Sequence, residues 1–230
     1  MQNDRARYVW DVFERIAPRY DLMNRLMTGG QDQAWRREVI RRARLSGGAR
    51  LLDLGAGTGD LGREALRQAP EVSATLADFS TGMMATGKTR PGPALDWSAA
   101  DALNLPFADR TFDAVVSGFL LRNVTDVPRA LAEQQRVLKP GGRMVALDTT
   151  RPARSALTPL IWTHMHLVIP TLGWLLTGQR DAYRYLPNST ESFLRAEELA
   201  VRMIMAGFCK VGFRRLNFGT IAIHWGEKEA

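Results

Sequence analysis

The chain has 230 residues, of which 45% are hydrophobic and 24% charged, a balance that excludes a disordered chain and fits one well-buried domain with a modest appendage. Its one cysteine, Cys209, excludes an internal disulfide, and the charged start MQNDRARYVW lacks the apolar core of a signal peptide, so we expect a cytoplasmic protein. The net charge of +7 would suit nucleic acid or anionic lipid as a partner. Nearly all of the basic charge is arginine, however, and a preference for arginine over lysine is as typical of genome-wide amino-acid composition as of a function.

The first 48 residues are expected to form an N-terminal helical segment, with helices over about residues 5–16 and 32–45. The densest basic run of the chain, WRREVIRRARL, lies in the second of these helices. Two interpretations of this run remain open: a solvated helix face, or an electrostatic contact with anionic lipid head groups. The arginines are not interleaved with aromatic side chains as base stacking would require, so we expect no nucleic acid partner.

Strands and helices then alternate through residues 49–148, the expected cofactor-binding core. The expected strands are ARLLDLG, VSATLAD, ALDWSAAD, FDAVVSG and RMVALD, and the expected helices are DLGREALRQA, STGMMATGK and DVPRALAEQQRVL. The last helix should end at KPGG, because Pro140 cannot continue it and Gly141 or Gly142 can take the left-handed conformation that closes it. Strands separated by helices predict a mostly parallel sheet with right-handed crossovers.

An insertion, residues 149–192, interrupts this alternation. No Asp, Glu, Lys or Arg occurs between Ser155 and Gln179, and the stretch is strongly apolar. Its two prolines and two histidines argue against a membrane span, which leaves ordinary core helices or an apolar lid or membrane-docking surface. The histidines have no Cys, Asp or Glu nearby, so we expect no metal site. Residues 193–230 then predict a helix over about 195–206 and two strands that pair as a hairpin around Gly219 at the sheet edge.

The stretch LLDLGAGTGD, residues 51–60, places glycines directly behind an apolar strand, which is typical of a nucleotide-type pocket because glycine lets the backbone lie against a ligand. A dinucleotide fingerprint would have a small residue where Asp60 stands, and a carboxylate at that helix start would repel a phosphate. Asp53 adds a second negative charge beneath the loop. A ligand with cationic groups and no phosphate fits this loop, so we predict S-adenosylmethionine as the cofactor, bound around Gly55 and Gly57.

Polar groups follow the next strands in the same way. Asp78 ends the second strand, where it is placed to accept both ribose hydroxyls. Asp101 closes the third strand with Ala102 beside it, where a carboxylate or a backbone group can meet the adenine amino group. Ser117 ends the fourth strand. Because parallel strands end at one edge of the sheet, these residues are predicted to face one crevice.

Several motifs together resemble the menaquinone and ubiquinone biosynthesis C-methyltransferases: APRYDLMNRLMTGGQDQAWRR, LDLGAGTGD, LPFADRTFD, LRNVTD, RVLKPGGR and DAYRYLPNST. They are spread over nearly the whole chain. The resemblance implies an α/β fold of the class I S-adenosylmethionine-dependent methyltransferases, a Rossmann-like sheet with helices on both faces, N-terminal helices and an apolar insertion after the fifth strand. It also implies that Thr58 contacts the cofactor together with Asp78, Asp101, Ala102 and Ser117.

For substrate, the resemblance implies a polyprenylated quinol methylated on a ring carbon. Demethylmenaquinol is the first expectation, and the benzoquinol precursor of ubiquinone is the closest alternative. A less favoured alternative, methylation of RNA, is suggested only by the basic charge of the chain. Because a polyprenyl tail lies in the bilayer, a peripheral contact with the inner face of the membrane is also expected. The oligomeric state is left open, with a homodimer as one option.

Methylation of an aromatic carbon needs an electron-rich ring, so the quinol should react as its phenolate. Arg122 and Asn123 are placed to bind that phenolate, although loop hydrogen bonds would also explain them. Four residues are candidates to fold over the substrate: Tyr20 and Asp21 on the N-terminal segment, and Tyr183 and Tyr185 on the insertion. For each tyrosine a simpler role in packing is the alternative.

Three residues depart from the family pattern. Phe119 and Leu120 stand where the family usually has a small residue before LRN, which should narrow the substrate pocket. Asp148 stands where the family usually has Glu. These departures leave the cofactor site intact and bear on the choice of quinol.

Overall fold

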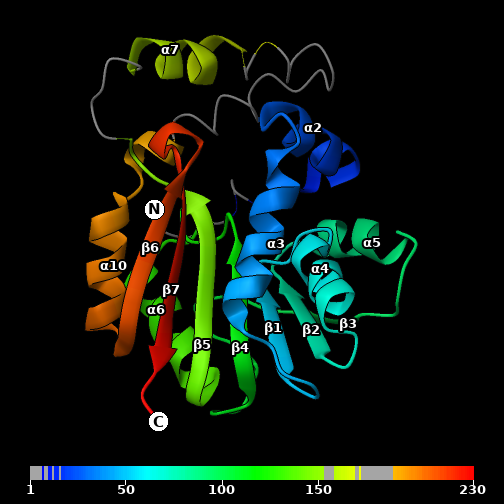
Figure 1. Ribbon diagram of the computed structural model, residues 1–230. Coiled ribbons are helices and arrows are strands. Elements are labelled where there is room, and N and C mark those ends of the chain that lie inside the picture. The colour runs from blue at the N-terminus through cyan, green and yellow to red at the C-terminus, as the bar shows by residue number, and fades with distance from the viewer. Residues whose placement is uncertain are drawn as a thin grey trace.

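The computed structural model describes residues 7, 10, 11, 13–15, 17–152, 158–168, 171 and 189–230. At its centre is a seven-stranded sheet with the order β3-β2-β1-β4-β5-β7-β6 (Figure 1). The strands are β1 (Arg50–Leu54), β2 (Ser73–Asp78), β3 (Asp96–Ala99), β4 (Phe112–Gly118), β5 (Leu138–Thr149), β6 (Phe208–Leu216) and β7 (Ile221–Lys228). Neighbouring strands are parallel except where β7 pairs with β5 and β6. The mostly parallel sheet and the terminal hairpin at its edge are therefore confirmed.

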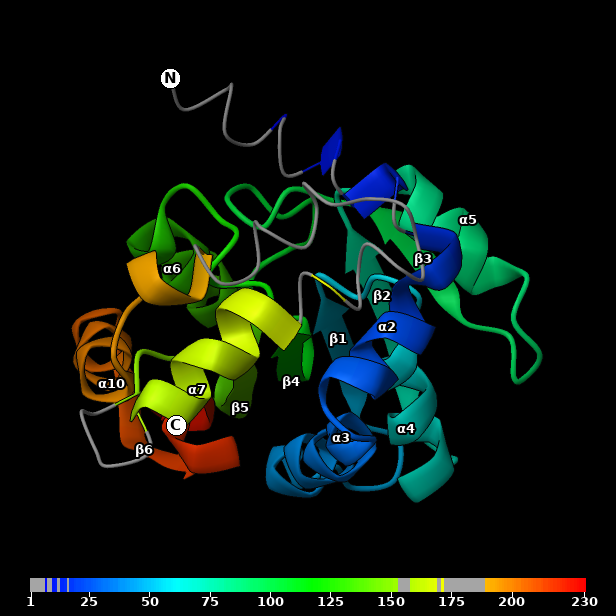
Figure 2. The same cartoon turned by 90° about the horizontal axis from the view of Figure 1, so that it is seen from above.

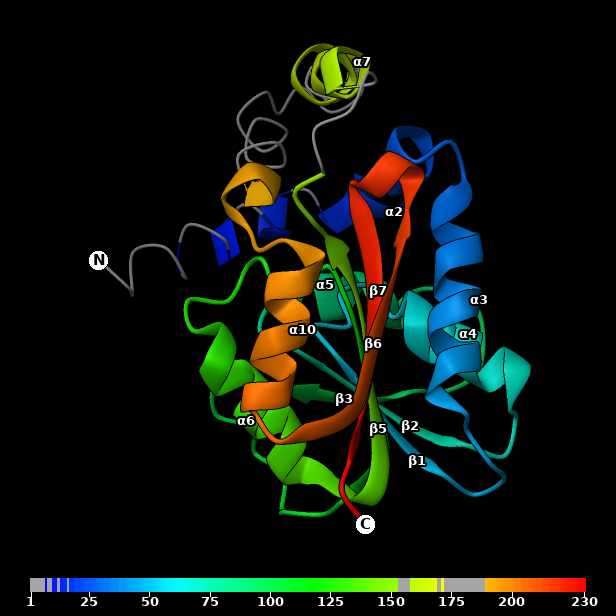
Figure 3. The same cartoon turned by 60° about the vertical axis from the view of Figure 1, so that its left-hand side comes forward.

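Helices cover both faces of this sheet. The helical elements of the described residues are η1 (Ala17–Arg19), α2 (Tyr20–Met27), α3 (Gln31–Ala43), α4 (Asp60–Gln68), α5 (Thr81–Lys88), α6 (Val127–Val137), α7 (Thr158–Thr163), η2 (His164–Val168), α10 (Ala196–Met205) and η3 (Asn217–Gly219). Helices α3 and α4 lie on one face, and α6 and α10 lie on the other (Figures 1 and 3). Helices α2 and α7 lie instead beyond the carboxyl ends of the parallel strands, the end that Figure 2 shows from above.

The alternation of side chains along β1 divides the hydrophobic core into two layers. Leu52 and Leu54 pack in the layer beneath α6 and α10, whereas Leu51 packs in the layer beneath α3 and α4. A strand whose two faces are both buried reads as a continuous apolar run, which is why LLDL could be recognised as a central strand. The exception in that run is Asp53, which is 1% exposed and lies where the strand reaches the glycine loop.

Two elements differ from the expectation. Helix α2 (Tyr20–Met27) was not predicted, because it is short and follows directly on the 3-10 turn η1. Strand β5 begins at Leu138 and not after the two glycines, since α6 has already ended at Val137. Gly141 does take the left-handed conformation, with φ +74°, but it serves the irregular start of β5, where the pairing with β4 shifts register.

The arginine run of α3 is engaged largely within the protein. Arg41 and Arg42 both pair with Glu38, and the Arg42 guanidinium lies 3.7 Å from the centroid of the Trp225 ring. Arg36 pairs with Asp32 at the start of the same helix. These contacts favour a structural helix face over a lipid-binding one for this run.

Some expectations fall outside the described residues. The helix expected over residues 5–16 is described at residues 7, 10, 11 and 13–15, which are helical. Most of the insertion, including Tyr183 and Tyr185, is not described. Within the described ranges, no helix is both long and apolar enough to cross a bilayer.

Candidate cofactor and active site

A cavity of about 300 Å³ opens at the carboxyl ends of β1, β2 and β4. Its lining residues come from the glycine loop, the ends of β2 and β4, the turn after β3 and the N-terminal segment: Trp10, Phe13, Tyr20, Leu54, Gly55, Gly57, Asp78, Phe79, Ser80, Met83, Ala100, Asp101, Ala102, Leu103, Gly118, Phe119, Leu120, Asn123, Val124 and Thr125. Ligands of open α/β sheets bind at this edge, so the position agrees with the predicted crevice.

The glycine loop forms one wall of the cavity with bare backbone. Gly55 and Gly57 have φ of +68° and +56°, the left-handed region that residues with a Cβ rarely adopt. A Cβ on Gly55 would lie 2.9 Å from the Leu120 side chain. Side chains are therefore excluded here both by conformation and by space, and the wall can approach a ligand closely.

Asp78 is fixed by this loop and by the residues that follow β2. Its two carboxylate oxygens accept hydrogen bonds from the Gly57 and Ser80 backbone N–H groups, at 2.6 and 2.8 Å. Burial raises the pKa of the Asp78 carboxyl above its ordinary value, and the backbone hydrogen bonds oppose that shift. Each carboxylate oxygen retains a second lone pair, so the carboxylate can still accept the two hydroxyls of a ribose.

Asp53 lies beneath the loop with one oxygen free to act on a ligand. Its Oδ2 accepts a hydrogen bond from the Gly62 N–H at 2.9 Å, whereas its buried Oδ1 has no hydrogen-bond partner among the described residues. Burial raises the pKa of Asp53 to about 7. Asp53 also lines a chamber of about 30 Å³ that adjoins the loop, together with Tyr20 and Arg36. A buried acceptor without a partner is expected where a cationic group binds, so the residues fit the ammonium of S-adenosylmethionine.

Asp60 begins α4 as expected, but its charge is balanced within the protein. Its two carboxylate oxygens pair with Arg36 at 3.0 Å and with Arg90 at 2.7 Å. The argument that Asp60 repels a phosphate is therefore weaker than the sequence suggested. The preference for a cationic ligand depends instead on Asp53 and Asp78.

The remaining residues predicted to bind the cofactor lie at different depths. Asp101 and Ala102 line the cavity, and the Asp101 carboxylate accepts the Leu103 N–H at 2.9 Å. Thr58 is buried behind the glycine loop, where its hydroxyl donates to Asp21 at 2.7 Å. Ser117 is also buried and does not line the cavity; its Oγ bonds to none of the described residues.

Tyr20 and Asn123 line the cavity, and Arg122 does not. Burial raises the pKa of the Tyr20 hydroxyl, so at neutral pH this group is a hydrogen-bond donor and not a base. The Asn123 side-chain amide donates to the Phe119 carbonyl at 2.8 Å, which is the loop hydrogen bond that the alternative interpretation required.

Arg122 lies behind the cavity wall and pairs with Asp148 of β5. Its Nη1 and its backbone N–H each donate to a different oxygen of Asp148, both at 3.2 Å, and both side chains are buried. The guanidinium also lies 4.9 Å from the centroid of the Phe119 ring. A direct contact between Arg122 and a phenolate thus remains a prediction, and the residue's observed role is to hold the turn after β4.

Tyr20 of the N-terminal segment was expected at the substrate, but the contribution of Trp10 and Phe13 was missed. Trp10 and Phe13 line the cavity together with Tyr20. The helical spacing of apolar residues before Ile16 was visible in the sequence, but it predicted only packing, and no local signal showed that this face would cover a ligand site.

Solved structures share this architecture. An S-adenosylmethionine-dependent methyltransferase from Thermotoga maritima, described as a possible histamine N-methyltransferase, superposes with a TM-score of 0.69 at 20% identity, over 96% of this chain and all of that one. The [4+2]-cyclase SpnF superposes with a TM-score of 0.70 at 19% identity, over 98% of this chain and 97% of that one. The fold is therefore that of the class I S-adenosylmethionine-dependent methyltransferases.

The chain belongs to the ubiE/COQ5 methyltransferase family, whose model matches residues 1–228. It is 48% identical to the ubiquinone/menaquinone biosynthesis C-methyltransferase UbiE of Desulfotalea psychrophila, over 94% of this chain and 89% of that one. It is 42% identical to the demethylmenaquinone methyltransferase of Thermus thermophilus, over 94% of this chain and all of that one. The resemblance seen in the motifs is thereby confirmed, and so is the cofactor.

Proposed function

We propose that the protein methylates a ring carbon of demethylmenaquinol. The observation that carries this proposal is the apolar wall facing the cofactor loop, which includes Leu103, Leu120 and Val124. A flat bicyclic ring presents more apolar surface to such a wall than a benzoquinol with a methoxy group does. The name of the Thermus thermophilus relative supports the same substrate.

S-adenosylmethionine supplies the methyl group as an electrophile on its sulfonium. The residues of this chain would hold the quinol and stabilise its phenolate. Tyr20 and Asn123 lie on the cavity wall, and both side chains carry hydrogen-bond donors that can point at the quinol oxygens. The apolar wall excludes water, which strengthens those hydrogen bonds, and the buried Arg122 adds positive charge behind the turn.

The decisive experiment is transfer of a radiolabelled methyl group from S-adenosylmethionine to short-chain demethylmenaquinol, to a 2-methoxy-6-prenyl benzoquinol and to total RNA in parallel. We expect label in reduced demethylmenaquinol, with loss of that label in the Asp78→Ala variant. Preference for the benzoquinol would place the enzyme in ubiquinone synthesis, and label in RNA alone would overturn the quinol proposal.

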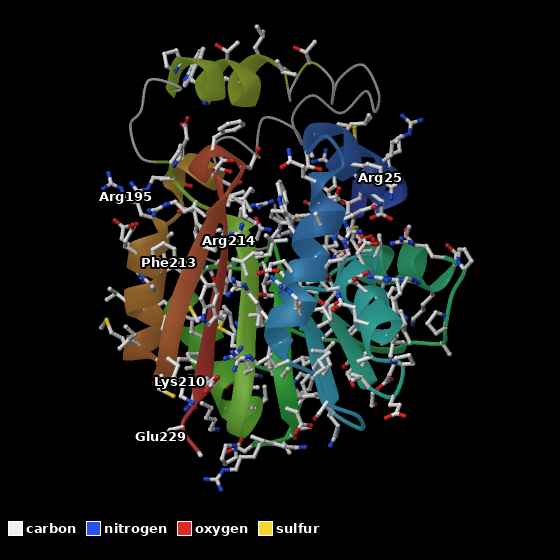
Figure 4. The ribbon with its side chains drawn as sticks, viewed as in Figure 1. Arg25, Arg195, Lys210, Phe213, Arg214 and Glu229 are labelled. Atoms are coloured by element: carbon white, nitrogen blue, oxygen red, sulfur yellow. The ribbon has the colours of Figure 1, made fainter. Side chains whose placement is uncertain are left out.

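We also propose that the surface beyond the carboxyl ends of the parallel strands contacts the membrane. Exposed apolar side chains from helices α2, α7, η2 and the turn η3 gather at this end: Leu22, Leu26, Trp162, Leu167, Val168 and Phe218. Figure 4 shows Arg25 extending outward from α2 at this end, whereas Lys210 and Glu229 lie near the opposite one. Apolar groups with a nearby cation suit an anionic bilayer, which would deliver a substrate with a polyprenyl tail.

Sedimentation with vesicles tests this contact. Vesicles containing phosphatidylglycerol should bind the wild-type protein more than vesicles of phosphatidylcholine alone. The Phe218→Ser variant should bind less, whereas Met205→Ser, an exposed apolar residue on α10, should not. Equal binding of the two variants would contradict the proposed surface.

A further inference from the structure

Described residues between positions 10 and 20 of the N-terminal segment form part of the wall of the cofactor cavity. Trp10, Phe13 and Tyr20 all line the cavity, and the rings of Phe13 and Tyr20 meet edge to face with centroids 5.9 Å apart. Helix α2, which begins at Tyr20, lies at the carboxyl end of the sheet in two views (Figures 1 and 2). A ligand in this cavity would therefore be enclosed between the sheet and the segment.

One carboxylate fastens this segment to the residues that follow Asp78. Glu14 Oε1 accepts hydrogen bonds from the Ser80 hydroxyl at 2.7 Å and from the Gly82 N–H at 2.8 Å. The Gly82 N–H lies in the first turn of α5, where the unpaired backbone N–H groups favour a negative charge. The Ser80 N–H donates to Asp78, the residue predicted to bind the ribose hydroxyls. Ser80 therefore connects Glu14 with Asp78.

A second carboxylate fastens the segment to the glycine loop. Asp21 accepts the Thr58 hydroxyl at 2.7 Å and pairs with Arg90 at 3.0 Å. Arg90 in turn pairs with Asp60 at the start of α4 and donates to the Thr58 carbonyl. Both attachment points therefore belong to the loops that would hold the cofactor, and these loops are joined to each other by the hydrogen bond from the Gly57 N–H to Asp78.

We propose that Glu14 and Asp21 are positioning residues that clasp the N-terminal segment over bound S-adenosylmethionine, so that the segment opens for cofactor exchange and closes when the cofactor orders the two loops. Free-energy coupling between two events is reciprocal. Closing the clasp tightens cofactor binding, and cofactor binding closes the clasp to the same extent. The proposal concerns the cofactor alone and does not depend on which quinol is methylated.

Gly82 offers a variant that breaks the first contact without altering the carboxylate or a residue that lines the cavity. A Cβ at Gly82 would lie 2.0 Å from Glu14 Oε2, so Gly82→Ala must displace the Glu14 side chain. Alanine has a higher helix propensity than glycine, which keeps α5 intact. Glu14→Ala removes the same contact from the other side. Glu64→Ala, which removes a carboxylate paired with Arg67 on the surface of α4, is the matched control.

Two readouts test the clasp. The first is the affinity and dissociation rate of S-adenosylmethionine and S-adenosylhomocysteine; both variants at the first contact should release the ligand roughly tenfold faster, as expected for loss of a charge-assisted hydrogen bond, while Glu64→Ala should not. The second is limited trypsin cleavage after Arg15 and Arg19, from which the cofactor should protect the wild-type protein more than the variants.

A double-mutant cycle separates the clasp from general destabilisation. If Gly82→Ala acts by displacing Glu14, it should add no further effect to Glu14→Ala, whereas independent damage would be additive. Asp21→Ala should add to either variant, because it breaks the second contact. The proposal is overturned if ligand release from Glu14→Ala and Gly82→Ala stays within twofold of wild type, or if the cofactor leaves trypsin cleavage unchanged.

Discussion

The cofactor side and the substrate side of the cavity differ in the groups that form the wall. Around Asp78 the wall consists of glycine backbone and a carboxylate that two backbone N–H groups fix at the end of a buried strand. Around Leu120 the wall consists of side chains on a turn, opposite others on the N-terminal segment. The first wall depends on the sheet for its geometry, whereas the second depends on contacts between segments distant in sequence. We therefore expect substitutions on the two sides to change different measured quantities.

The largest effect is expected behind the substrate side, at Asp148. This residue is 2% exposed and forms a buried pair with Arg122, so Asp148→Asn removes a buried carboxylate charge that faces the guanidinium. Removing the carboxylate charge of this buried pair should lower the free energy of unfolding by about 3 kcal/mol, measured as a lower urea midpoint at constant m-value.

The control for this variant is Asp113→Asn. Asp113 pairs with Lys139 at 2.8 Å, but both side chains are more than a third exposed, so the loss should be below about 1 kcal/mol. Cofactor affinity of folded Asp148→Asn should remain near that of wild type. A large loss of cofactor affinity without a loss of stability would contradict the separation of the two sides.

On the cofactor side, a substitution at Asp78 should weaken cofactor binding and change the free energy of unfolding little. Asp78→Asn removes the charged acceptor for the ribose hydroxyls and places an amide near the Gly57 and Ser80 N–H groups. We expect the Kd for S-adenosylhomocysteine to rise about 100-fold, which corresponds to about 2.7 kcal/mol. Calorimetric titration measures this change, with Asp96→Asn on the exposed edge strand β3 as the control. A Kd within threefold of the wild-type value would contradict the assignment of Asp78 as a cofactor-binding residue.

Asp53 should give the cofactor side a pH dependence. Its pKa of about 7 in the folded protein lies above the ordinary value of 3.8, so the folded state holds a proton that the unfolded state releases between these pH values. The contribution of Asp53 to stability is thus present below pH 4 and declines as the pH rises toward 7. A cationic ligand prefers the ionised carboxylate, so the affinity for S-adenosylmethionine should rise on the order of tenfold between pH 5.5 and pH 7.

The Asp53→Asn variant checks this assignment. Its affinity should be weaker and should no longer rise over that range of pH. Proton release on binding, measured by calorimetry at pH 6 in buffers of different ionisation enthalpy, should disappear in the same variant. An undiminished rise in Asp53→Asn would assign the titration to another group.

The same division explains what the sequence could predict. Asp53 and Asp78 could be placed at one edge of the sheet because each ends or adjoins an apolar strand, and parallel strands bring their carboxyl ends together. The contact between Glu14 and Ser80 joins residues 66 positions apart, and no local pattern marks either partner. Arg122 was expected in the cavity because it follows Ser117 closely, but Phe119 has φ +60°, and the turn that contains it directs Arg122 toward Asp148. Strand ends are thus readable from local sequence, whereas the direction of a turn depends on its partners in three dimensions.

The smallest expected effect concerns the choice of quinol. It should change the preference between two substrates and leave cofactor binding as it is. Leu120 lines the cavity, and its side chain lies against Gly55 of the cofactor loop. Leu120→Ala should therefore open space beside the loop and improve methylation of the methoxy benzoquinol relative to demethylmenaquinol by about fivefold in kcat/KM, or about 1 kcal/mol. The Kd of the cofactor should stay unchanged. Leu103→Ala enlarges the same cavity from the turn after β3, so an equal shift in that variant would assign the preference to total volume and not to Leu120. A shift confined to Leu120→Ala would show that one side chain on the turn selects the ring while the cofactor side remains as it was.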